Sequence, residues 1–219
     1  MNGMTVILSK EWQTFIGSDR GMFLLYVVLV CSWSIMLANP PGGAIQTGPL
    51  WLVFFSVVIS ANFSNTVFIS ERINGNLEIL LTCGLSRNHI LFGKMIFVAG
   101  ISILIGLLCI GLSTVLRIAM QPAAGTAIGI SEVLLYCSAV VMNTALSAWL
   151  SVLMSNPRLL HLANLLILAL IVTLYTVLTA YLPLPPAILS AVLTLIGIAA
   201  TGAALRLYNS ENILKPVNL

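Results

Sequence analysis

The sequence predicts an all-α membrane protein, and three observations carry the prediction. Hydrophobic residues make up 59% of the 219 residues and charged residues 7%, whereas about a quarter of the residues of a soluble domain are charged. The mean hydropathy is +1.09. The apolar residues form continuous runs rich in leucine, isoleucine and valine, without the alternation typical of membrane β-strands. We therefore expect residues 1–219 to form one helical domain in a lipid bilayer.

Six of these runs are long enough to cross the bilayer, because a helix needs about 20 apolar residues to span the hydrocarbon core. Short segments rich in proline, glycine and polar residues separate them. The expected spans are Gly21–Ala38, Pro49–Ile69, Met95–Leu116, Val133–Met154, Leu159–Leu182 and Pro186–Leu205. Small residues four positions apart predict that two of these helices approach a neighbour closely, at Ser102–Gly106 and at Ala199–Ala203.

An amphipathic helix is expected before the first span, over residues 4–20. Its apolar residues recur at helical spacing, and its charged residues lie elsewhere on the helix. This pattern is typical of an elbow helix that lies in the membrane surface and contacts lipid. The alternative is a cytoplasmic extension of the first span. The charged residues also exclude a secretory signal peptide, so we expect this segment to stay in the protein.

Lysine and arginine are distributed very unevenly between the two expected faces of the membrane. With a cytoplasmic amino terminus and six crossings, eight of the nine basic residues face one side, and only Arg117 faces the other. Cytoplasmic loops carry an excess of lysine and arginine, so we expect both termini on the cytoplasmic side of the inner cell membrane. This asymmetry accounts for the net charge of +3 without a nucleic-acid partner.

The segment between the second and third expected spans, residues 71–94, concentrates charge. A short amphipathic helix is expected from Glu71 to Leu81, and Gly84 would end it. Ser86 can then cap a second helix, which begins near Arg87 and continues through Lys94 into the third span. Such a helix, turn and helix could dock its apolar side in a partner's groove. Alternatively, the loop merely anchors the bundle to lipid headgroups.

This loop resembles the corresponding loop of ABC-2 type transporter permeases, the membrane subunits of ABC exporters. The matching positions are Glu71, Arg72, Gly75, Leu77, Glu78, Leu80, Leu81, Ser86, Arg87, Ile90, Leu91, Gly93 and Lys94. A second likeness is the sequence LYNSENIL at residues 207–214. The chain departs from the pattern at Cys83 and Gly84, where many relatives have a proline-containing stretch.

The resemblance implies that the loop is a coupling helix, which binds an ABC ATPase subunit and transmits its closure to the membrane helices. The implied partner-binding residues are Glu71, Arg72, Gly75, Leu77, Glu78, Leu80, Leu81, Ser86 and Arg87. ATP and magnesium would bind to that partner, because this chain has no phosphate-binding Gly-x-x-x-x-Gly-Lys-Ser/Thr loop. Six spans are half of the twelve that such a permease usually has. The resemblance therefore implies a dimer with a second copy of the chain or with a related chain.

Two other functions stay open. The haem-exporter B subunit of cytochrome c maturation shares the motif, so a similar role is the first alternative. A membrane scaffold that docks a soluble partner without transport is the second. An enzyme is not expected, because the chain has no paired carboxylates, no Ser-His arrangement and no metal-ligand set.

A few mildly polar residues within the expected spans could line a substrate path. They are Asn62, Asn65, Asn143, Ser147, Thr173 and Thr176. For each of them, an ordinary hydrogen bond between helices is the alternative. No acidic residue lies in the middle of a span, which favours an externally powered pump over an ion-coupled carrier. Such a path suits a hydrophobic or amphipathic cargo.

Overall fold

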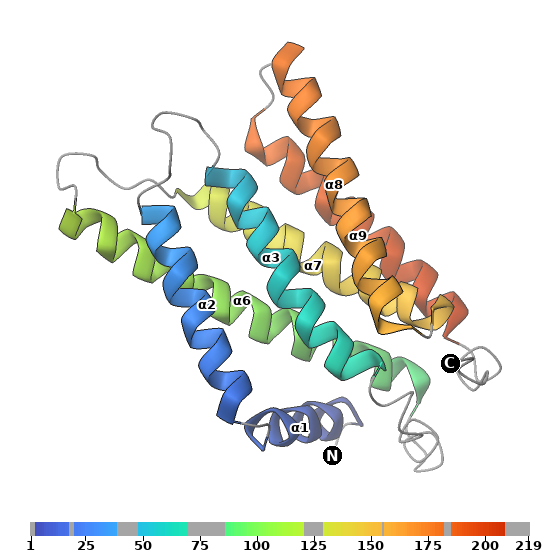
Figure 1. Cartoon of the computed structure of the whole chain (residues 1–219). Coiled ribbons are helices and arrows are strands. Elements are labelled where there is room, and N and C mark those ends of the chain that lie inside the picture. The colour runs from blue at the N-terminus through green and yellow to red at the C-terminus, as the bar shows by residue number, and fades with distance from the viewer. Residues whose placement is uncertain are drawn as a thin grey trace.

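The computed structural model describes residues 3–17, 20–38, 48–69, 86–120, 129–154, 156–181 and 185–208, and these ranges are almost wholly helical (Figure 1). The predicted all-α class is confirmed for this part of the chain. In order, the helices are α1 (Gly3–Ile16), α2 (Arg20–Ala38), α3 (Gly48–Ser64), the π-helical turn η1 (Asn65–Ile69), α6 (Arg87–Met120), α7 (Ile130–Leu153), α8 (Pro157–Tyr181) and α9 (Pro186–Leu207).

Within the described residues, four helical stretches are long and apolar enough to cross a membrane. They are Trp51–Phe68, Arg87–Met120, Ile130–Leu153 and Ala187–Leu207. Shorter apolar stretches lie at Leu24–Ala38 in α2 and Leu162–Tyr175 in α8. Each of the six apolar runs in the sequence therefore forms a helix, and four of these helices have the length and composition of a membrane span.

Local sequence explains where several helices begin. Ser86 caps α6, because its Oγ accepts a hydrogen bond from the backbone N–H of His89, with the two atoms 3.4 Å apart. Glu132 reaches back to the start of α7, where its Oε2 accepts a hydrogen bond from the N–H of Gly129 at 2.8 Å. Asn156 Oδ1 similarly accepts from the N–H of Arg158 at the start of α8. The predicted cap at Ser86 is thus confirmed.

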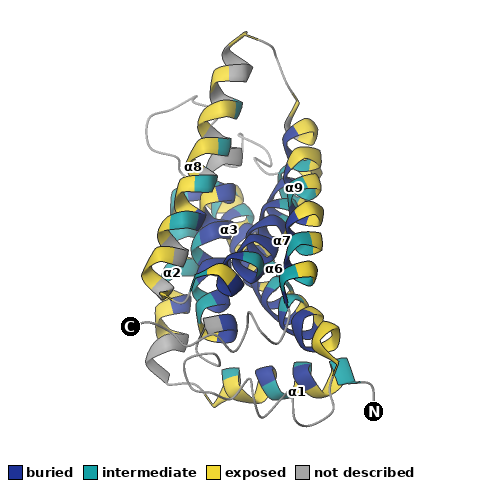
Figure 2. Cartoon of the chain, turned by 90° about the vertical axis from the view of Figure 1, so that its right-hand side faces the viewer, coloured by how far each residue is buried: buried dark blue, intermediate teal, exposed yellow. Residues whose placement is uncertain are grey.

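The longer helices run along the bundle, whereas α1 lies across one end of it (Figures 1 and 2). We call this the α1 end. There η1 ends, α6 and α8 begin, and α7 and α9 end (Figure 1). The described basic residues other than Arg117 belong to helix segments at this end: Lys10, Arg20, Arg87, Lys94, Arg158 and Arg206. The one-sided charge expected from the sequence is therefore present in the fold.

Helix α7 forms the centre of the bundle. It packs along α9 and α3, and it also contacts α6 and α8. Most of its side chains are buried, while α8 and the outer side of α9 are largely exposed (Figure 2). Exposed leucine, isoleucine and valine side chains on a bundle of this composition are suited to contact lipid.

Glycine allows two close contacts with α7. At Gly106 of α6, a Cβ atom would overlap the ring of Tyr136, whose hydroxyl donates a hydrogen bond to the carbonyl of Ser102 at 2.7 Å. At Gly197 of α9, a Cβ atom would lie 3.2 Å from the Cα of Met142. Residues Ser102 and Gly106 therefore serve the close approach that their spacing predicted.

The second predicted pair, Ala199 and Ala203, does not form the close contact between α9 and α7. Ala199 is exposed and Ala203 is only half-buried. The buried positions of this helix are instead Leu189, Leu193, Gly197, Ala200 and Ala204, and α9 packs on α7. Small residues line several faces of this helix, so spacing alone did not identify the face that meets α7.

We expect Gly106→Ala to lower the free energy of unfolding by about 1–3 kcal/mol, because the ring of Tyr136 must move aside. Gly100→Ala is the matched control on the same helix, since a Cβ atom there would meet nothing within 4 Å. Thermal unfolding of the purified chain in detergent measures both variants. Equal unfolding temperatures for the two variants would contradict the close contact.

Candidate functional site

The two elements that flank the charged loop of the sequence meet it at the α1 end, where η1 ends and α6 begins (Figure 1). Residues 70–85 lie outside the described residues, and with them the predicted partner-binding residues Glu71, Arg72, Gly75, Leu77, Glu78, Leu80 and Leu81. The structure does describe Ser86 and Arg87, which are both exposed at the start of α6. It also describes the two elements that flank the loop, namely η1 before it and α6 after it.

A buried lysine connects these two elements. The side chain of Lys94 in α6 is fully buried, at 0% exposure. Its Nζ donates a hydrogen bond to the backbone carbonyl of Val67 in η1, at 2.9 Å. It also lies 6.0 Å from the centre of the Phe68 ring. The last carbonyls of a helix have no partner within it, so the end of η1 is a favourable place for an acceptor.

Helix α1 packs against α6 beside this lysine. Ile7 is fully buried, and a Cβ atom at Gly93 would lie 2.9 Å from its Cγ2. Glu11 is also buried, and its Oε1 lies 3.5 Å from the Nζ of Lys10. The negative charge of Glu11 also acts favourably on Lys94. We call Ile7, Glu11, Val67, Phe68, Gly93 and Lys94 together the Lys94 junction.

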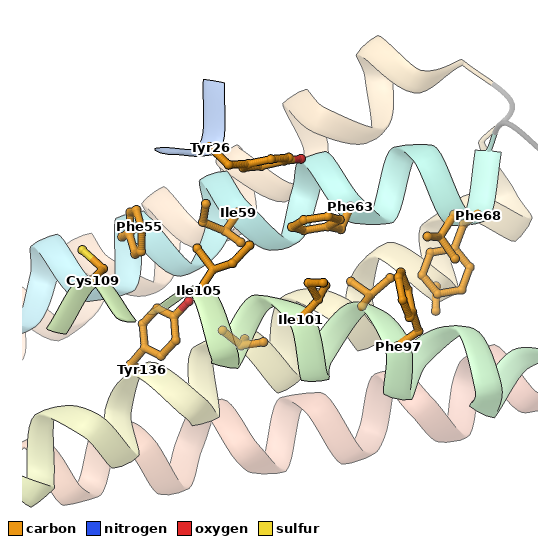
Figure 3. Close-up of a cluster of buried hydrophobic side chains, with 14 of the residues drawn as sticks. Tyr26, Phe55, Ile59, Phe63, Phe68, Phe97, Ile101, Ile105, Cys109 and Tyr136 are labelled. Carbon is orange, nitrogen blue, oxygen red and sulfur yellow. The ribbon is translucent and has the colours of Figure 1, made fainter. Parts of the chain in front are cut away.

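Aromatic side chains extend this packing into the core. Phe15 of α1 lies between Phe63 of α3 and Phe97 of α6, with ring centres 5.6 and 6.5 Å away. Tyr26 of α2 stacks on Phe63, with ring centres 4.9 Å apart. Figure 3 shows Phe63, Phe68 and Phe97 among the buried side chains of this core cluster, with Tyr26 beside the segment of α2. Four helices therefore meet in one aromatic cluster near the Lys94 junction.

The residues predicted to line a substrate path are not gathered into one group. Asn143 and Ser147 are buried on α7. Asn62 is half-buried and donates to the carbonyl of Val58 in its own helix, while Asn65 is half-buried in η1. Thr173 is exposed and donates to the carbonyl of Ala169. The side chain of Thr176 lies outside the described residues.

Two of these residues form hydrogen bonds between helices. Asn143 donates to Ser56 of α3 at 3.4 Å, and Ser147 accepts a hydrogen bond from Asn164 of α8 at 2.7 Å. All four side chains are almost completely buried. The alternative considered for these positions, a hydrogen bond between helices, therefore describes Asn143 and Ser147. Sequence reasoning overlooked Ser56 and Asn164, although an asparagine within an apolar run was an available signal.

The second motif, LYNSENIL, is described only at its first two residues. Leu207 ends α9, and Tyr208 follows it with its side chain buried in the same core cluster as Phe97. Burial raises the pKa of the Tyr208 phenol. Within the described residues, no group of three or more histidine, cysteine, aspartate or glutamate side chains could hold a metal ion.

We expect Gly93→Ala to loosen α1, because the added methyl group must displace Ile7 or the helix that carries it. Hydrogen exchange should then become faster by about tenfold or more at the amides of residues 3–16, which corresponds to a local cost of about 1.4 kcal/mol. Gly100→Ala, which adds the same methyl group at an open position of α6, should leave exchange in α1 unchanged. An unchanged rate in the Gly93 variant would show that α1 does not depend on this contact.

Neither the scan against protein-family models nor the search of the curated proteins finds a match for this chain. Its function is therefore inferred from the pattern of its own residues and from the geometry of its α1 end.

Proposed function

We propose that the chain is the permease subunit of an ATP-driven exporter of the ABC-2 type. Six helices cross the cytoplasmic membrane, and both termini lie in the cytoplasm. A separate ATPase subunit binds the loop at residues 71–94 and supplies the energy. A second copy of the chain or a related chain completes the permease, which moves a hydrophobic or amphipathic substrate by alternating access.

The observation that carries the proposal is the hydrogen bond from Lys94 to the carbonyl of Val67. It joins the helix that precedes the charged loop to the helix that follows it, inside a buried junction. A displacement of the loop would therefore reach α3 and α6 together. A coupling loop has to transmit motion in this way, because a loop with independent ends would absorb it.

The distribution of basic residues supports an orientation in which the α1 end faces the cytoplasm. Basic residues gather at the α1 end, and Arg117 lies in the last turn of α6 at the other end. In this proposal the α1 end faces the cytoplasm, where the ATPase and its ATP and magnesium are found. Glu71 and Glu78 contact the ATPase or brace the loop, with Arg72 and Arg87 as their candidate partners.

The orientation can be tested with the native Cys83 in the loop. A membrane-impermeant thiol reagent should label Cys83 in inside-out vesicles and not in intact cells, because the loop faces the cytoplasm. Ile130→Cys provides the opposite control, since this residue is 82% exposed at the start of α7, on the far end of the bundle. Labelling of Cys83 from outside intact cells would refute the orientation and the proposal with it.

Coupling can be tested with Glu71→Ala and Glu78→Ala in the complex that co-purifies with the chain. Loss of one charge from a buried interfacial pair costs about 2–5 kcal/mol, so retention of the ATPase or its stimulated ATP hydrolysis should fall by about tenfold or more. Uptake of an amphipathic fluorescent dye into inside-out vesicles should fall in parallel.

Glu132→Gln is the control for this experiment, because it removes a carboxylate at the opposite end and keeps an acceptor oxygen for the cap of α7. Unchanged hydrolysis and uptake in the Glu71 and Glu78 variants would contradict the coupling role. A bound partner without ATP hydrolysis would indicate the scaffold instead. Co-purification of cytochrome c maturation proteins would indicate the haem-exporter B-like role.

A further inference from the structure

We propose that Lys94 is a positioning residue that joins α1, η1 and the start of α6 into one rigid unit, so that the elbow helix moves with the coupling loop. This inference rests on the proposed function for its role in transport, but the rigid unit itself is a property of the chain alone.

The burial of Lys94 is costly in free energy unless other groups compensate it. A basic side chain taken out of water is destabilising unless it has a hydrogen-bond acceptor and an opposite charge nearby. Val67 of η1 provides an acceptor at 2.9 Å. The charge of Glu11 in α1 favours the charged form of Lys94, whereas that of the neighbouring Lys10 opposes it. Because the acceptor and the acidic residue come from different elements, movement of η1 or α1 away from α6 removes one of them.

Helices α1 and α6 are in close contact beside Lys94. Gly93 leaves room for Ile7 to lie directly against the backbone of α6, and Ile7 is fully buried there. A side chain at position 93 would hold the two helices further apart. The glycine and the lysine are neighbours in sequence, so one turn of α6 contacts both α1 and η1.

The apolar side chains of α1 have two different surroundings. Ile7 and Phe15 face the protein, together with Glu11. Trp12 and Ile16 are 49% and 65% exposed, which suits the membrane interface. An anchor that only floated in the membrane surface would need one apolar side. The second side of α1 is used to hold it to the bundle.

Distances between spin labels test the rigid unit in the chain alone, in lipid nanodiscs. Cysteines at Thr66 and Asn88 report the separation of η1 and α6, and Gln13 with Asn88 reports that of α1 and α6, with the native cysteines replaced by alanine. All three positions are exposed. Both distance distributions should be narrow, and Lys94→Met should broaden both or add a longer distance.

Two controls separate positioning from general instability. Arg158→Met removes another basic side chain at the α1 end, where it is exposed, and should leave both distributions narrow. A label pair at Ile130 and Ala187, at the opposite end, should not change in the Lys94→Met variant. If Lys94→Met leaves the two junction distances as they are in the unsubstituted chain, the proposal is wrong.

A disulfide tests the same idea without removing Lys94. Ile7→Cys with Gly93→Cys should form a cross-link on oxidation. A Cβ atom at position 93 would lie 3.0 Å from the Cβ of Ile7, so a small outward shift of α1, of about 0.5 Å or more, reaches the separation of about 3.5–4.5 Å that a disulfide needs. In the complex with the co-purified ATPase, ATP hydrolysis should stay within about twofold of that of the reduced form, because α1 and α6 never separate.

Loss of hydrolysis on oxidation, with recovery on reduction, would show that α1 must leave α6 and would overturn the proposal. The two ideas fail differently. If the distance distributions are narrow and depend on Lys94 but the chain binds no ATPase, the rigid unit stands and the exporter proposal is refuted. If ATP hydrolysis depends on the loop but the junction distances do not change in Lys94→Met, the exporter proposal stands and the rigid unit is refuted.

Discussion

The α1 end of this protein depends on the need of one buried lysine for an acceptor. Inside a helical bundle most backbone carbonyls already accept a hydrogen bond from their own helix, so a helix end offers a buried donor a readily available acceptor. Lys94 finds it at Val67, in the π-helical turn that ends α3. This hydrogen bond holds the start of α6 against η1, and the charge of Glu11 in α1 acts favourably on the same lysine.

The remainder of the bundle is organised by α7, whose neighbours have small or polar residues where they approach it. Gly106 and Gly197 let α6 and α9 pack against this helix at short distance, and Ser56 and Asn164 form hydrogen bonds with two of its polar side chains. Helix α8 also packs Ile167, Ile171 and Tyr175 against the core. The hydrogen bond from Asn164 to Ser147 adds a buried polar contact between α8 and α7.

The positions of the helices could be predicted from the sequence, because apolar runs, caps and breaking residues are local signals. Six expected spans correspond to six helices, and Ser86 caps α6 as expected. Which face of a helix meets which neighbour could not be predicted, since that depends on contacts between distant residues. Asn143 could equally have faced a substrate path, and the alanines at 199 and 203 resembled a contact face. The burial of Lys94 was invisible for the same reason, as a lysine before an apolar run usually ends in the membrane interface.

Helix α6 is longer than a membrane crossing requires. Its 34 residues extend about 51 Å at 1.5 Å per residue, against a hydrocarbon core of about 30 Å. If a helix of that length tilts as a rigid body around the part packed in the bundle core, its two ends move in opposite directions. Tilting it by about 10° around its midpoint would carry Arg87 sideways by about 4 Å, and Arg117 in the opposite direction by a similar amount. In the proposed exporter, a small rotation at the α1 end would thus become an opposite displacement at the far end of α6.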